Sequence, residues 1–195
     1  MSLQKKIENN FKQSLSVENS SEPLFVPTSK EKFDALKSLI GDKSSKFIDF
    51  YKDSQPNQIS NYKSYSTLLN IDRIIEENTE LVPGVFLSKI GIFVFAVTIG
   101  GNAVCIDTND TKDGDPVVLI IDHSLLYFDA DDYEEEVEIE IANLPSYIDE
   151  DDFTDEDFEF NYENVRKFVY KIEDSFVEFI KKYSQNLYGD FENYL

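Results

Sequence analysis

The candidate strands follow one another so closely that they restrict the possible fold. The β-rich runs are 85–87, 92–98, 103–108, 117–121 and 125–128, and segments rich in glycine, asparagine and aspartate separate them. A parallel strand pair needs a crossover of a dozen or more residues, which these connections cannot supply. The spacing therefore predicts an antiparallel meander, with Gly100-Gly101-Asn102 closing one of its hairpins.

Helical patterns lie on both sides of this meander. The candidate helices start at Thr28, Ser45 and Asn70 before it and at Asp174 or Ser175 after it. Thr28 with Glu31 fits a capping box, and Gly41 is placed to end the first helix. Helices first, an antiparallel meander next and a packing helix last predict the α+β class.

The chain has 195 residues, a length that suits one domain. We expect a tail or short helix over 1–22, a single domain over 23–188 and a C-terminal tail over 189–195. No apolar run reaches the roughly 18 residues that a membrane-spanning helix needs. The N-terminus also lacks the apolar region of a secretory signal, so we expect a cytoplasmic protein.

The acidic residues are concentrated in one stretch. Residues 129–163 hold 17 acidic and no basic residues, whereas the rest of the chain holds 22 acidic and 18 basic residues. Most of the net charge of −21 therefore comes from this insertion. A field of that sign repels nucleic acid and anionic lipid and attracts basic proteins. We expect a protein partner, no nucleic acid and no membrane.

The second half of this stretch mixes carboxylates with aromatic rings. The candidate partner-binding residues are Asp149, Glu150, Asp151, Asp152, Phe153, Asp155, Glu156, Asp157 and Phe158, with Phe160 and Tyr162 following. A loop that only keeps a chain soluble gains nothing from exposed aromatic rings. The rings either pack on the chain's own core or bind a partner, since aromatic residues dominate binding hot spots. For the carboxylates, a solvated loop remains the alternative to a docking surface.

Two further segments, one inside the acidic stretch and one directly after it, have a pattern that suggests secondary structure. Acidic and apolar residues alternate over 134–141, which predicts a half-buried strand. Residues 165–172 fit either a strand or a helix, and the sequence leaves that choice open.

The polar residues between Asp107 and Asp115 have the composition of a calcium loop without its register. Counted from Asp107, the sixth position is Lys112 instead of glycine, and counted from Asn109, the twelfth position is Ile120 instead of a bidentate carboxylate. We interpret the segment as a polar hairpin connection and expect no metal.

The chain has one histidine, His123, and one cysteine, Cys105. Cys105 lies inside an apolar strand, where cysteine usually serves as a small buried side chain, and His123 follows a strand. Gly100-Gly101 lacks the spacing of a phosphate-binding loop, and no serine lies in a GxSxG motif. We therefore expect no enzymatic activity and no cofactor.

Several local patterns occur in an order that resembles the SUKH superfamily. The matching segments, which together span about residues 24–185, are Phe47-Ile48-Asp49-Phe50-Tyr51, Leu68-Leu69 with 71–75, 93–97 with the glycine turn and 103–107, 113–118, and 174–180. The superfamily includes yeast cell-wall regulators of the Smi/Knr type and cytoplasmic bacterial immunity proteins that neutralise toxins, often nucleases. The resemblance implies an α+β domain with a curved, mostly antiparallel central sheet and no enzymatic activity.

The chain departs from the superfamily pattern in two respects. It has no tryptophan, and it inserts the acidic stretch 129–163 before the terminal helix. The acidic stretch and the resemblance together favour an immunity protein that occludes a basic toxin domain, and a regulatory scaffold of the Smi/Knr type is the alternative. The partner's identity and the oligomeric state stay open.

Overall fold

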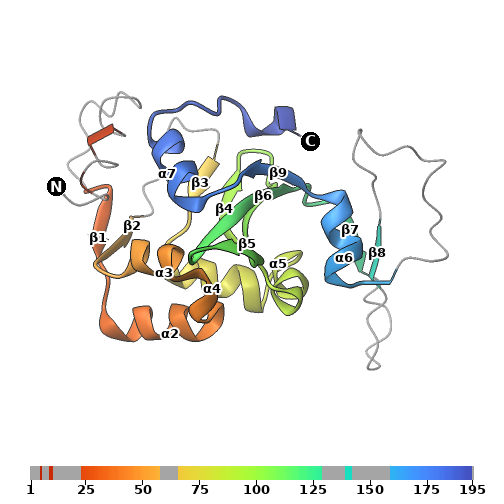
Figure 1. The fold of residues 1–195 in the computed structure, drawn as a ribbon, viewed down its shortest axis with the longest axis horizontal. Coiled ribbons are helices and arrows are strands. Elements are labelled where there is room, and N and C mark those ends of the chain that lie inside the picture. Colours follow the sequence, from red (N-terminus) through yellow and green to blue (C-terminus); the bar gives the residue numbers. More distant parts are fainter. Residues whose placement is uncertain are drawn as a thin grey trace.

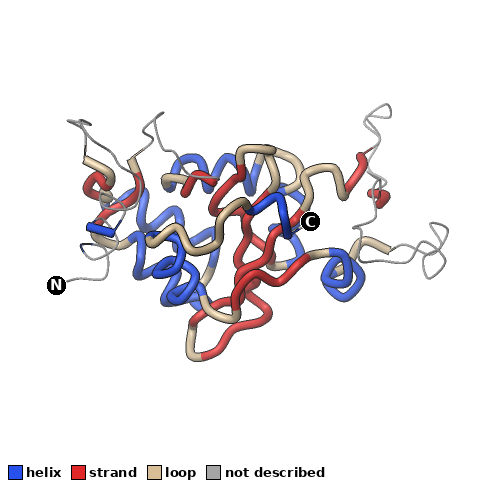
Figure 2. Tube along the Cα trace, turned by 90° about the horizontal axis from the view of Figure 1, so that it is seen from above, coloured by secondary structure: helices blue, strands red, loops and turns tan. Residues whose placement is uncertain are grey.

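A computed structural model describes Lys5 and residues 9–10, 23–57, 66–128, 139–141 and 159–194. Along the longest axis, β1 with α2 and α3 lies at one end and the main sheet lies in the middle (Figures 1 and 2). Helix α6 and the β7–β8 pair lie toward the other end. The arrangement is the predicted α+β fold.

The main sheet has five strands, all paired antiparallel, as the close spacing of the runs predicts. In spatial order they are β3 (Ser66–Leu68), β4 (Ile92–Thr98), β5 (Ala103–Lys112), β6 (Asp115–Ile121) and β9 (Tyr170–Glu173). The β4–β5 hairpin turns at Gly100-Gly101, as predicted. Strand β5 runs beyond its predicted end at Thr108 because its register shifts after Asp107 and pairing with β6 resumes at Thr111.

Two small sheets accompany the main one. Strand β1 (Phe25–Pro27) pairs with β2 (Ser54–Pro56), and neither is among the strands that the sequence predicts. Strand β7 (Leu126–Phe128) pairs with β8 (Ile139–Ile141), so the strand predicted over 134–141 is confirmed where the structure describes it.

The described helices are α2 (Lys30–Ile40), η1 (Asp42–Ser44), α3 (Ser45–Tyr51), α4 (Ile71–Thr79), α5 (Gly84–Leu87), η2 (Ser88–Ile90), α6 (Tyr162–Val165), η5 (Arg166–Phe168), α7 (Phe176–Ser184) and η6 (Phe191–Tyr194). The four helices that the sequence predicts, α2, α3, α4 and α7, begin close to the predicted residues. Asn70 and Ser175 cap α4 and α7 through their side chains, as predicted. The cap of α2 is Ser29, one residue after the predicted Thr28.

One predicted strand, 85–87, is instead the short helix α5. The backbone N–H of Val85 donates to Leu81 O at 2.8 Å, which closes a helical turn. A Cβ at Gly84 would lie 2.1 Å from Glu77 O. Because α5 packs this closely on α4, tertiary contact overrides the β preference of these residues.

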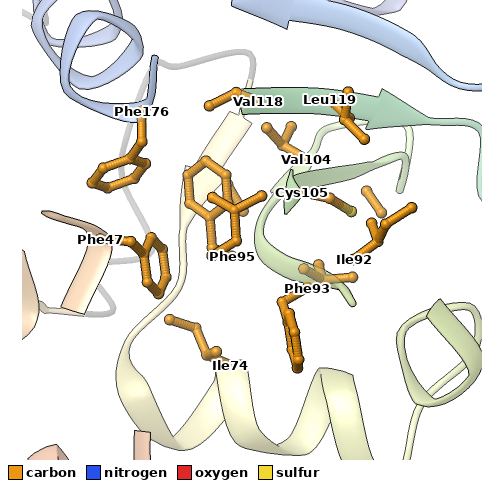
Figure 3. Packing of buried hydrophobic residues seen from close by; sticks show 14 of the residues in the cluster. Phe47, Ile74, Ile92, Phe93, Phe95, Val104, Cys105, Val118, Leu119 and Phe176 are labelled. Atoms are coloured by element: carbon orange, nitrogen blue, oxygen red, sulfur yellow. The ribbon is translucent and has the colours of Figure 1, made fainter. Parts of the chain in front are cut away.

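An aromatic cluster joins the helices to the sheet. Phe47 of α3, Phe95 of β4 and Phe176 of α7 point toward one another (Figure 3). The ring centroids lie 4.9 Å apart for Phe47 and Phe176 and 5.5 Å apart for Phe95 and Phe176. All three rings are buried, so these contacts place the terminal helix on the sheet.

Described residues from both terminal segments contact the same helix, α7. Phe191 is 2 % exposed and its ring centroid lies 6.1 Å from that of Phe179, so the packed core extends past the limit of 188 predicted for the domain. In the segment 1–22, of which Lys5, Asn9 and Asn10 are described, Asn10 Nδ2 donates to Ser184 Oγ. Leu187 is exposed because the helix ends before it, at Ser184. Within the described ranges, every helix is too short or too polar to cross a membrane.

Candidate functional site

The predicted partner-binding residues lie outside the part of the chain that the structure describes. They are Asp149, Glu150, Asp151, Asp152, Phe153, Asp155, Glu156, Asp157 and Phe158. Their contacts therefore stay a prediction. The structure does describe where the chain leaves the acidic stretch, from Glu159 onward, and this junction forms one wall of a groove.

The junction is fixed to the folded body by an aromatic contact and a helix cap. The Phe160 ring lies edge-on to Phe86 of α5, with 6.5 Å between centroids. Asn161 Oδ1 accepts from the backbone N–H of Asn164 at 2.9 Å and so caps α6. For Phe160, the prediction that some aromatic rings near the acidic stretch pack on the chain's own core is confirmed.

A buried carboxylate, Asp107 of β5, holds the next turn of the junction. Its Oδ2 accepts from the Tyr162 hydroxyl at 2.9 Å and lies 3.3 Å from Arg166 Nε. Its Oδ1 accepts from the backbone N–H groups of Asn109 and Asp110. A fully buried charge is tolerated only when it is paired and hydrogen-bonded, and Asp107 meets both conditions.

The Tyr162 hydroxyl acts as a hydrogen-bond donor to Asp107. Burial raises the pKa of its phenol to about 12, and the hydrogen bond to Asp107 and the negative charge of that carboxylate act in the same direction. At neutral pH the phenol is therefore protonated and donates to Asp107. The contact joins α6 to β5 across a long separation in sequence.

Beside this junction lies an open groove with a volume of about 840 Å³. Its apolar lining includes Ile40, Ile90 and Phe93, and its polar lining includes Lys43, Lys89 and Glu163. Ile40 and Phe93 are buried, whereas the two lysines and Glu163 are exposed. The groove thus combines a few apolar side chains at its base with exposed charged side chains of both signs.

The wall of the groove at Gly91 is held by side-chain hydrogen bonds. Asn109 Nδ2 donates to Ile90 O and Thr108 Oγ1 donates to Gly91 O, each at 2.8 Å. Gly91 has φ +82°, and a Cβ there would lie 2.5 Å from Asn109 Nδ2, so only glycine fits without displacement. This part of the groove is preformed.

Cys105 and His123, the two residues considered as candidates for catalysis, are both held in the fold by packing or hydrogen bonds. Cys105 is fully buried in β5, as predicted, and burial raises the pKa of its thiol. His123 follows β6, and its Nδ1 lies 2.9 Å from Asn102 Oδ1, so Nδ1 carries the proton. Within the described ranges, no group of three or more His, Cys, Asp or Glu residues is placed to hold a metal ion.

Comparison with protein-family models, with curated proteins and with solved structures finds no match to this chain. The functional proposals therefore rest on the charge, burial and contacts of its own residues and on the resemblance stated above.

Proposed function

We propose that the chain is a non-enzymatic protein-binding domain, an immunity protein of the SUKH type that covers the active surface of a basic toxin domain. The observation that carries this proposal is the distribution of charge, with 17 acidic and no basic residues over 129–163 and a nearly balanced remainder. Toxins that cleave nucleic acid bind phosphate with basic surfaces. An acidic surface can occupy such a groove in place of the nucleic acid.

The described elements on either side of the candidate partner-binding residues, 149–158, support this role. Strand pairing of β7 with β8 fixes residues 126–128 and 139–141, and the Asp107 network fixes α6. Both boundaries lie toward the same end of the molecule (Figure 1). Anchoring both sides of a binding segment lowers the conformational entropy that the segment loses on association.

The charged and the aromatic residues would contribute differently to binding. Complementary fields accelerate the encounter of two proteins, which suits an inhibitor that must act before its toxin does. Most of the affinity would come from a few aromatic anchors, for which Phe153 and Phe158 are the candidates. The carboxylates would then set the rate and the specificity of binding.

The proposal is tested by affinity capture from the native host with a charge-matched control. The variant D151N/D152N/D155N/D157N removes four carboxylates from the acidic stretch. The control D34N/D49N/D53N/E80Q removes four exposed carboxylates from other elements. We expect the wild-type chain and the control to retain a basic protein that the first variant loses. Equal capture by both variants would refute the docking role of the stretch.

The identity of the captured protein separates the immunity role from the scaffold role. A toxin domain encoded beside this chain supports immunity, and a cell-wall or signalling protein supports a scaffold of the Smi/Knr type. Turnover of a small substrate by the purified chain would contradict the non-enzymatic part of the proposal.

A further inference from the structure

We draw no further inference here: the strongest candidate, the outer edge of the main sheet at β9, is a short strand with a register shift opposite β6, and nothing in the part of the chain that the structure describes shows what covers that edge.

Discussion

The side chain of Asn78 in α4 forms hydrogen bonds with the backbone of Val94 in β4. The side chain is 2 % exposed, its Oδ1 accepts from Val94 N at 2.8 Å, and its Nδ2 donates to Val94 O at 2.8 Å. Val94 lies where the register between β4 and β5 shifts. One amide side chain thus satisfies both backbone groups of a buried residue at a bulge.

Replacing Asn78 should therefore destabilise the fold more than a typical substitution. N78A leaves the N–H and the C=O of Val94 buried without partners, and we expect a loss of about 3 kcal/mol in the free energy of unfolding. Urea denaturation measures the loss. T79A, at the exposed next position of the same helix, should cost less than about 0.5 kcal/mol. Equal losses would show that the Asn78 contacts contribute nothing.

Phe176 has a comparable role in the aromatic cluster. Its ring is 1 % exposed and contacts the rings of Phe47 and Phe95 (Figure 3). It also contacts the ring of Phe50, with 5.5 Å between the centroids. F176A should lower the free energy of unfolding by roughly 3–5 kcal/mol, because the cavity cannot close around three other large rings. L187A, at a side chain that is 64 % exposed, is the control and should leave the melting temperature unchanged. A melting temperature of F176A equal to that of the wild type would contradict the packing.

At the scale of elements, Glu173 joins β9 to the terminal helix. Its carboxylate accepts from Lys182 and from the Tyr188 hydroxyl. Burial alone would raise the pKa of the Glu173 carboxyl, but these two hydrogen bonds outweigh burial and hold the pKa below its usual range. The ionised form is therefore favoured in the folded state.

Because the pKa of Glu173 is lowered in the folded state, its contribution to stability decreases as pH falls. A carboxyl with a lowered folded pKa stabilises the protein above its unfolded pKa, near 4.3, and this contribution is lost as pH falls through the folded pKa. We expect the stability of the wild type to exceed that of E173Q at pH 6, with the difference shrinking as pH falls below about 4. Chemical denaturation of both proteins across this range measures it. A difference that is constant or grows toward low pH would contradict the assigned contacts.

The sequence predicted those elements whose signals are local. Strand β4 has its predicted bounds, 92–98, because an apolar run is closed by Gly100-Gly101. The caps at Asn70 and Ser175 were readable because a short polar side chain precedes an apolar helical face. The strand β2 and the helix α5 were missed, since pairing with β1 and packing on α4 decide them. For residues 165–172 the sequence does not decide between helix and strand. The segment contains both, a helical part that ends at Phe168 and then strand β9.

At the scale of the whole molecule, the groove could not be predicted because its lining comes from segments far apart in sequence. Ile40, Lys89, Thr108 and Tyr162 meet only in the folded chain. One sequence feature does point to the Asp107 network. Asp107 is a carboxylate that directly follows the apolar run 103–106 in a strand. Such a residue needs a buried cation or donor, but the sequence does not say that Arg166 and Tyr162 supply them.

The molecule is an α+β body with a concentrated negative charge, and we propose that this charge serves to bind a basic protein. The sharpest test of this claim is stopped-flow association of the full chain with the basic protein that it retains from its native host. Salt from about 0.01 to 1 M shortens the Debye length from about 30 Å to about 3 Å. We expect the association rate constant to fall at least about tenfold over this range for the wild type and much less for D151N/D152N/D155N/D157N. A rate that is independent of salt, or an equal dependence in both proteins, would contradict the claim.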